Sequence, residues 1–327
     1  MKFLVIGCGS IGERHIRNLR LLTDQPIIAC DTNSERLRLI KEKYHLETYL
    51  DVDEALNQKP DAVLICTPPT LHISQGLKAV EHDAHLFMEK PLSHSLKHVD
   101  LLLKQAKKKN VIIFVGYNLR FHPGIQLLKK LLDEGTIGKV FSARVEFGQY
   151  LPDWRPQQNY RQTYTARKEL GGGIILDASH EIDYIRYLLG EVTTVSCISA
   201  TLSDLEVNVE DTAEILTTFK NNGIAEIHLD FVQREYSRNC KIIGEKGTIV
   251  WDYPGNYVKT YNSETKQWTT HPTVIEPNEM YLAEMKHFLA CLQGNATPLV
   301  NGDDAKKTLE IVLAAKQSSN TGKMIRL

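Results

Sequence analysis

The strongest constraint on this chain is a glycine-spaced turn that follows its first apolar run. The run Phe3–Ile6 ends at a GxGxxG pattern, and a helix-like stretch to Leu22 comes next. In such a turn the first glycine permits a tight reversal, the second lets a pyrophosphate approach the backbone, and the third lets helix and strand pack closely. The helix N-terminus then offers free N–H groups and a partial positive charge to the phosphates. The pattern predicts a dinucleotide site that includes Gly7, Gly9, Ser10, Ile11 and Gly12.

A carboxylate follows the second apolar run at the spacing expected for a ribose ligand. Asp31 lies 19 residues after Gly12. A carboxylate at this position binds the ribose diol and repels a 2′-phosphate, which favours NAD over NADP. Asp31 is also suited to cap the helix expected over 34–44, and the two roles are compatible. Arg36 or Arg38 would soften the preference for NAD.

The first 120 residues alternate between strand and helix signals. Because strands and helices alternate, we expect a doubly wound parallel sheet, a Rossmann domain, over residues 1–120. Ligands then lie at the carboxyl ends of its strands. Strands are expected at 2–6, 26–30, 61–66, 84–88 and 111–115, and the helices between them include 34–44, 72–81 and 95–109.

From residue 121 onward the pattern changes to consecutive strands. Hairpin-like turns separate several of them, which favours an open, mostly antiparallel sheet. We therefore expect a second α+β domain over residues 121–327. Its strands are expected at 139–148, 193–201, 212–219, 224–232, 239–243 and 247–252, and its helices include 124–134, 277–293 and 302–317.

Composition excludes several classes of protein. With 42% apolar residues, 24% charged residues and a formal net charge of −1, nothing favours nucleic acid or an anionic membrane as a partner. No apolar run approaches the roughly 20 residues of a membrane span. The first strand is expected from residue 2, which leaves no room for a signal peptide. The six cysteines form no CxxC pair, as expected of reduced thiols in a cytoplasmic protein.

A lysine marks the carboxyl end of another expected strand. Lys90 follows Glu89 directly after the apolar run 84–88, and Pro91 biases its backbone toward an extended conformation. The Lys90–Pro91 bond can adopt either isomer, and a cis bond would aim the side chain into a cleft. A partly desolvated lysine at this edge is suited to acid–base work on a substrate hydroxyl. The alternative, a surface Glu–Lys pair before a loop, stays open.

Three consecutive glycines precede a helix that carries polar residues on one face. Asp177, His180 and Tyr184 share that face at helical spacing. Such a stripe is usually only the solvated side of an amphipathic helix. The spacing also suits a metal site, but no clear third ligand follows, so we expect no metal.

Taken together, these segments resemble the Gfo/Idh/MocA family of NAD(P)-dependent sugar oxidoreductases over nearly the whole chain. The resemblance rests on the order and spacing of several short motifs. They are the glycine loop, Cys66–Pro69 with His72, Glu89–Pro91, Gly116–Pro123, the triple glycine with Asp177 and His180, and the ending from Asp303 to Lys323.

The resemblance implies a sugar, polyol or nucleotide-sugar substrate and a homodimer or homotetramer formed through the second domain's sheet. It also implies roles for matched residues. Lys90 is the usual acid/base, and Asp177 and His180 lie near the reacting carbon. Positions near the dinucleotide are Thr67, Pro68, His72 and Glu89, and Asn118 and Arg120 match the stretch that enters the substrate cleft. By residue type, Trp154 and three arginines are candidates for binding a phosphate, a carboxylate or a sugar face: Arg120, Arg155 and Arg161. The alternative, an exposed polar loop, stays open.

Two residues separate Asp177 from His180, whereas many family members have three, so the role of Asp177 is less secure than that of His180. Residues 151–156 resemble a subset of bacterial surface-polysaccharide oxidoreductases, which points to a sugar or nucleotide sugar. Other functions stay open. They are a non-catalytic NAD-binding sensor, a reductase of a pigment or dihydrodiol, and a methyltransferase, against which the intact GxGxxG argues.

Overall fold

The computed structural model describes residues 1–327, which divide into two compact units. The first unit comprises residues 1–118 and 277–309, and the second comprises 119–276 and 310–327. The sequence pattern predicts a second domain that runs without interruption from 121 to 327. In the structure, 277–309 belongs to the first unit because helix α10 (Glu279–Leu292) packs against helix α1 (Ser10–Leu22).

The first unit is built on a six-stranded, all-parallel sheet of order β3-β2-β1-β4-β5-β6. The predicted Rossmann sheet is thereby confirmed. Strands β1, β2, β4 and β6 are buried throughout, which requires cover on both faces. The strands are β1 (Phe3–Ile6), β2 (Ile27–Cys30), β3 (Glu47–Tyr49), β4 (Ala62–Ile65), β5 (His85–Glu89) and β6 (Ile113–Gly116).

Helices alternate with these strands as the sequence pattern predicts, with two differences. A short strand, β3, and a short helix, α3, lie in a segment that carries no clear periodicity. Helix α5 begins at Val99 rather than at 95, because His98 before it has a left-handed φ of 61°. The remaining helices are α2 (Ser34–Tyr44), α3 (Val52–Leu56), α4 (His72–Glu81) and α5 (Val99–Lys108).

The second unit contains a nine-stranded sheet of order β14-β13-β12-β11-β7-β10-β9-β8-β15. It is mostly antiparallel, as predicted, with one parallel pair between β7 and β10. Its strands are β7 (Val140–Gly148), β8 (Val192–Ala200), β9 (Thr212–Phe219), β10 (Ile224–Asp230), β11 (Ser237–Gly244), β12 (Gly247–Asp252), β13 (Tyr257–Asn262), β14 (Gln267–Pro272) and β15 (Ile325–Arg326).

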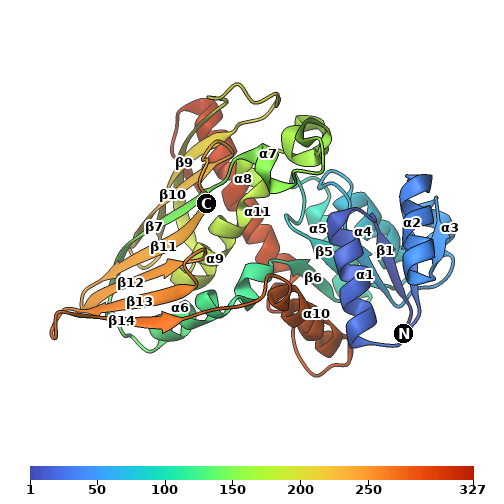
Figure 1. Ribbon diagram of the computed structural model, residues 1–327, viewed down its shortest axis with the longest axis horizontal. Helices are drawn as coiled ribbons and strands as arrows, with labels where there is room; N and C mark the ends of the chain where they lie inside the picture. Colours follow the sequence, from blue (N-terminus) through green and yellow to red (C-terminus); the bar gives the residue numbers. More distant parts are fainter. The chain divides into compact units, whose positions relative to one another are not determined.

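Helices of the second unit lie along one face of this sheet, as Figure 1 shows for α6, α8 and α9. Its helices are α6 (Pro123–Asp133), α7 (Leu151–Trp154), α8 (Ile174–Asp177) and α9 (Ser179–Leu189), with four 3-10 turns at Asn118–Phe121, Tyr160–Gln162, Tyr164–Ala166 and Lys168–Leu170. The last helix, α11 (Gly302–Thr321), contributes residues to both units. None of the helices is both long and apolar enough to cross a membrane.

Candidate active site

The glycine loop between β1 and α1 has the form that a dinucleotide site requires. Gly7 has a φ of +88°, and a Cβ added to it would lie 2.8 Å from the backbone of Cys66. A Cβ on Gly12 would lie 1.9 Å from the carbonyl oxygen of Gly7. A Cβ on Gly9 would meet no protein atom within 4 Å. The fold itself therefore demands glycine at the first and third positions, while the second fits the close approach of a ligand.

Helix α1 begins at this loop without a side-chain cap. Its N-cap is Gly9, and Ser10 and Ile11 form its first turn. Because the first N–H groups of a helix have no partner within the helix, they are suited to an anion such as a pyrophosphate. The loop and the helix start together fit the dinucleotide that the sequence pattern predicts.

Asp31 is fixed beside the loop by backbone N–H groups. The N–H of Cys8 donates to Oδ2 over 2.7 Å, and the N–H of Asn33 donates to Oδ1 over 2.9 Å. Each oxygen keeps lone pairs for ribose hydroxyls. The helix cap considered for Asp31 is supplied instead by Asn33, whose side chain accepts from the N–H of Arg36.

Both arginines near Asp31 are engaged by carboxylates. The Arg36 guanidinium pairs with Glu13 and also donates to the carbonyl of Cys8. Arg38 bonds Glu35 and Glu42 at 2.7 Å. Neither arginine side chain is free to attract a 2′-phosphate without giving up a partner, which supports the preference for NAD.

His72 ties the ends of two strands together. Its ring is fully buried, with Nε2 at 2.8 Å from the carbonyl oxygen of Thr67 and Nδ1 at 2.9 Å from that of Pro91. Thr67, next to the half-buried Pro68, also donates its hydroxyl to Gln75 over 2.6 Å. His72 therefore holds the backbone that follows β4 against the backbone that follows β5.

Lys90 directly follows Glu89, which is the last residue of β5. Glu89 accepts from Nε2 of the fully buried His15 at 2.6 Å, and its other oxygen accepts from the N–H of Lys90 at 3.2 Å. The Lys90–Pro91 peptide bond is cis. Lys90 is half-buried. His15 was not predicted, although it lies only three residues beyond Gly12 on α1.

In the second unit, the helix expected after the triple glycine is two helices. The helix is interrupted at Ala178, so Asp177 is the last residue of α8 and His180 lies in the first turn of α9. The prediction that one helix face presents Asp177, His180 and Tyr184 was therefore wrong. Tyr184 is fully buried against Trp251, with ring centroids 5.6 Å apart. His180 is half-buried.

Asp177 is buried and held by hydroxyl groups. Its Oδ1 accepts from Tyr164 over 2.7 Å, and its Oδ2 accepts from Thr165 over 2.6 Å. Both donors come from a segment of 3-10 turns, where the sequence carries no periodicity that would have revealed them. Two neutral hydroxyl groups thus hold the carboxylate.

Arg120 and Asn118 are both buried. The Arg120 guanidinium makes two bonds to Asp183, of 2.8 and 2.7 Å, and lies 4.7 Å from the centroid of the Tyr187 ring. A bidentate pair of this kind is strong and geometrically specific. The structure therefore gives Arg120 an internal partner that the sequence analysis did not identify.

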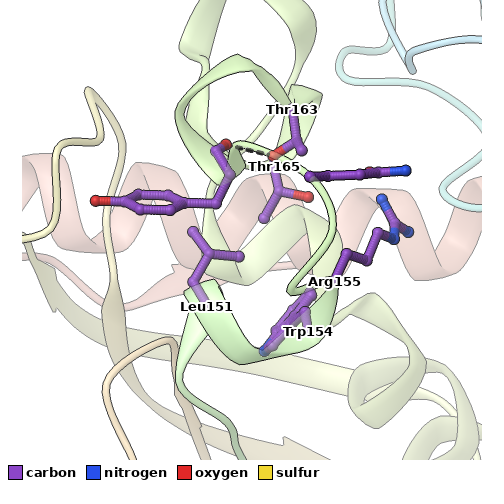
Figure 2. Close-up of a pocket in the computed structure, with 7 residues that line it drawn as sticks. Leu151, Trp154, Arg155, Thr163 and Thr165 are labelled. Atoms are coloured by element: carbon purple, nitrogen blue, oxygen red, sulfur yellow. Dashed lines mark hydrogen bonds between the residues drawn. The ribbon is translucent and has the colours of Figure 1, made fainter.

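Trp154 lines a small pocket in the second unit, which Figure 2 shows together with Leu151, Arg155, Thr163 and Thr165. Its indole N–H donates to the carbonyl of Gln149 over 2.9 Å, which orients the ring. Thr165 links this pocket to Asp177. Arg161 does not line the pocket, because it is exposed and pairs with Glu206 at 2.5 Å.

Comparison with known proteins agrees with this geometry. Residues 1–117 match the family model described as "Oxidoreductase family, NAD-binding Rossmann fold", and residues 125–250 match the "GFO/IDH/MocA C-terminal domain". The chain is 31% identical to myo-inositol 2-dehydrogenase of Thermotoga maritima, covering 100% of this chain and 98% of that protein. It is 27% identical to scyllo-inositol 2-dehydrogenase (NAD(+)) of Bacillus subtilis, covering 99% and 95%.

The fold has matches among solved structures. The WlbA dehydrogenase from Bordetella pertussis, solved with NADH and UDP-GlcNAcA, superimposes with a TM-score of 0.86 at 22% identity, covering 100% of this chain and 98% of that one. Fold and glycine loop together define an NAD-dependent oxidoreductase. The chain belongs to the Gfo/Idh/MocA family, as its sequence motifs indicated.

Proposed function

We propose that this enzyme oxidises a secondary hydroxyl of a sugar, polyol or nucleotide sugar, with Lys90 as the group that takes the hydroxyl proton. The observation that carries the proposal is the place of Lys90. It follows a parallel strand at the ligand-binding edge of the sheet that bears the dinucleotide loop. The substrate class is supported by relatives named as inositol dehydrogenases.

The cofactor's place is proposed from the residues that fit it. Gly7, Gly9, Ser10, Ile11 and Gly12 would hold the pyrophosphate and Asp31 the ribose; Thr67 and Pro68 would line the site, while His72 and Glu89 would position its backbone. When bound, NAD supplies the hydride acceptor of the reaction. The protein's part is to orient the substrate and to take up the proton, and general base catalysis of this kind is worth about 10²–10⁴-fold.

Residues of the second unit are proposed to bind the substrate. His180 would hydrogen-bond the reacting oxygen, and Asp177, already oriented by two hydroxyl groups, would orient the sugar. Trp154 offers an aromatic face to a sugar ring. Asn118, Arg120 and Arg161 are weaker candidates, because Asn118 is buried and both arginines have carboxylate partners.

We further propose a homodimer or homotetramer in the cytoplasm. Six free, buried cysteines suit a reducing compartment. The alternative of a non-catalytic sensor is disfavoured because the relatives are named as dehydrogenases.

The experiment that tests the substrate class is a screen of NAD reduction against inositols, free sugars, other polyols and UDP-sugars. We expect turnover with at least one of these hydroxyl compounds and a ketone as its product. If NADH binds but no member of the panel is oxidised, and no corresponding ketone is reduced by NADH, the substrate class is wrong.

A further inference from the structure

A carboxylate on the helix that follows the glycine loop holds two cations of the neighbouring helix. Glu13 lies in the first turn of α1, directly after Gly12. Its Oε2 pairs with the guanidinium of Arg36, and its Oε1 accepts from Nζ of Lys43 over 2.8 Å. The same oxygen accepts from the hydroxyl of Tyr44 over 3.1 Å. All three donors belong to α2, so both oxygens of Glu13 are used by one helix.

Glu13 is set up to remain an anion. Burial raises its pKa, but hydrogen bonds from Lys43 and Arg36 outweigh burial and leave that pKa below its usual value. A place in the first turn of a helix also favours a negative charge. Only 21% of the side chain is exposed, so solvent screens its ion pairs less than those of an open surface. Glu13 therefore competes with any other anion for Arg36.

Arg36 is anchored to the same residue as the carboxylate proposed to bind the ribose. Its Nε donates to the carbonyl of Cys8, and the N–H of Cys8 donates to Oδ2 of Asp31 over 2.7 Å. The charged partner of Arg36 is Glu13, and its side chain is 30% exposed, so an anion arriving from solvent can reach it. A phosphate on a ribose held by Asp31 would therefore come within reach of this guanidinium.

A guanidinium in this place is what a site for NADP requires. NADP differs from NAD by a 2′-phosphate on the adenosine ribose, and an arginine near the ribose is the usual group that accommodates it. Arginine suits phosphate because its planar fork can donate two parallel hydrogen bonds. Asp31 repels the 2′-phosphate, but a free Arg36 beside it would offset that repulsion. Asp31 alone is therefore insufficient to exclude NADP, and the partner of Arg36 decides the balance.

We propose that Glu13 is a specificity residue for the cofactor: by holding the guanidinium of Arg36, it withholds that cation from a 2′-phosphate, so that the site takes NADH and rejects NADPH. This inference rests on the proposed place of the ribose at Asp31, and on neither Lys90 nor the substrate class. The preference for NAD then comes from two carboxylates, one that binds the ribose diol and one that occupies the nearby cation.

The test compares two glutamates and measures binding instead of turnover. Glu13→Gln keeps the length of the side chain and one accepting oxygen but removes the charge that holds Arg36. Glu42→Gln removes the same charge from the exposed pair that Glu42 forms with Arg38 on α2, and is the matched control. NADH and NADPH are each titrated against every variant by the fluorescence of their nicotinamide ring, and thermal unfolding is measured in parallel.

In Glu13→Gln we expect NADPH to bind about tenfold more tightly than it binds the wild type, because Arg36 no longer has to leave a charged partner. The affinity for NADH should stay near that of the wild type, since NADH has no 2′-phosphate. Glu42→Gln should bind both cofactors like the wild type. The melting temperature of Glu13→Gln should fall, because α1 loses a charged contact with α2. A purely structural role of Glu13 predicts that fall without any gain in NADPH affinity.

Arg36→Met shows whether the gain depends on the guanidinium. In the double variant Glu13→Gln/Arg36→Met, most of the gain in NADPH affinity should disappear. In the single variant Arg36→Met, the ratio of NADPH to NADH affinity should match that of the wild type, because Glu13 already occupies the guanidinium there. A fall in this ratio would show that Arg36 binds the phosphate with Glu13 in place, and would overturn the proposal without need of a folded Glu13 variant.

The proposal is also overturned if Glu13→Gln binds NADPH no more tightly than Glu42→Gln does, or if the gain survives in the double variant. Asp31→Ser tests the place of the ribose separately. Unchanged NADH affinity in that variant would refute this place and, with it, the role of Glu13. Should Glu13→Gln gain NADPH affinity through Arg36 while no hydroxyl compound is oxidised, the proposed substrate class fails and the role of Glu13 stands.

Discussion

Two candidate site residues of each unit are held in place in different ways. In the first unit, Asp31 is fixed by N–H groups of Cys8 and Asn33, and His72 by the carbonyl groups of Thr67 and Pro91. In the second unit, Asp177 is fixed by the hydroxyl groups of Tyr164 and Thr165, and Arg120 by the carboxylate of Asp183. The first set depends on the course of the backbone, the second on particular side chains.

This difference determines which substitutions should displace each set of residues. A backbone-held residue tolerates changes in nearby side chains but not a change in loop geometry. A residue held by another side chain is released as soon as that partner is replaced, because a buried group left unpaired costs its full desolvation. Substitutions at residues of both kinds test this division.

The largest effect on stability is expected at the Arg120–Asp183 pair. Both side chains are buried, so Arg120→Met or Asp183→Asn leaves an uncompensated charge and should lower the free energy of unfolding by about 3–5 kcal/mol. Denaturant unfolding of both single variants and the double variant measures the coupling. A substrate-binding role for Arg120 predicts instead a raised KM in Arg120→Met with unchanged stability.

Substitutions at two glycines of the loop should affect stability and NADH binding differently. A Cβ at Gly12 would lie 1.9 Å from a backbone oxygen, so Gly12→Ala should cost about 1–3 kcal/mol of stability and abolish NADH binding. Gly9→Ala has room in the protein and should keep the wild-type melting temperature while NADH binding weakens about tenfold or more. Thermal unfolding and NADH fluorescence titration measure the two quantities. Unchanged NADH affinity in Gly9→Ala would contradict the proposal that the pyrophosphate binds at this loop.

The hydroxyl donors of Asp177 should produce a smaller effect. Thr165→Val removes one buried hydrogen bond and should lower stability by about 1–2 kcal/mol. Because Asp177 keeps Tyr164 but loses its fixed orientation, kcat/KM for the identified substrate should fall while NADH affinity stays constant. Thr163→Val, whose hydroxyl bonds only the nearby carbonyl of Tyr160, is the matched control. Equal kinetics in both variants would contradict a substrate role for Asp177.

The smallest effect concerns His228, another side-chain-held residue of the second unit. Its hydrogen bond to Asp230, followed by that to Glu214, raises the pKa of His228 from 6.5 to about 9 against the opposing effect of burial. The folded state binds the proton of His228 more tightly than the unfolded state does. The stabilisation is therefore full below pH 6.5 and is lost as the pH rises through about 9.

Because the side chains of His228 and Glu214 are partly exposed, the stabilisation by His228 should be about 1 kcal/mol or less. We expect His228→Gln to melt below the wild type at pH 6 and to match it at pH 10. A difference between the two melting temperatures that stays constant from pH 6 to pH 10 would show that the ion pairs contribute nothing.

The same division explains what the sequence could predict. The Rossmann strands, the glycine loop and the place of Lys90 follow from short local patterns, so they were predicted. Strands β13 and β14 were missed because most of their side chains are at least partly exposed, which removes the alternation that marks a strand. The start of α5 was misplaced because His98 adopts a left-handed conformation.

Long-range side-chain partners left no signal in the sequence. Nothing in a pattern of residues joins Arg120 to Asp183, which is 63 residues away, or His15 to Glu89, which is 74 residues away. The break at Ala178 was also hidden, because the residues on both sides of it suit a continuous helix. The packing of α10 against α1 is of the same kind.

The central claim is that Lys90 takes the hydroxyl proton in an NAD-dependent oxidation, and Lys90→Met tests it most directly. With the substrate found by the screen, kcat should fall by about 10²–10⁴-fold while NADH affinity and melting temperature stay near those of the wild type. A variant that binds NADH and oxidises the substrate at the wild-type rate would contradict the account.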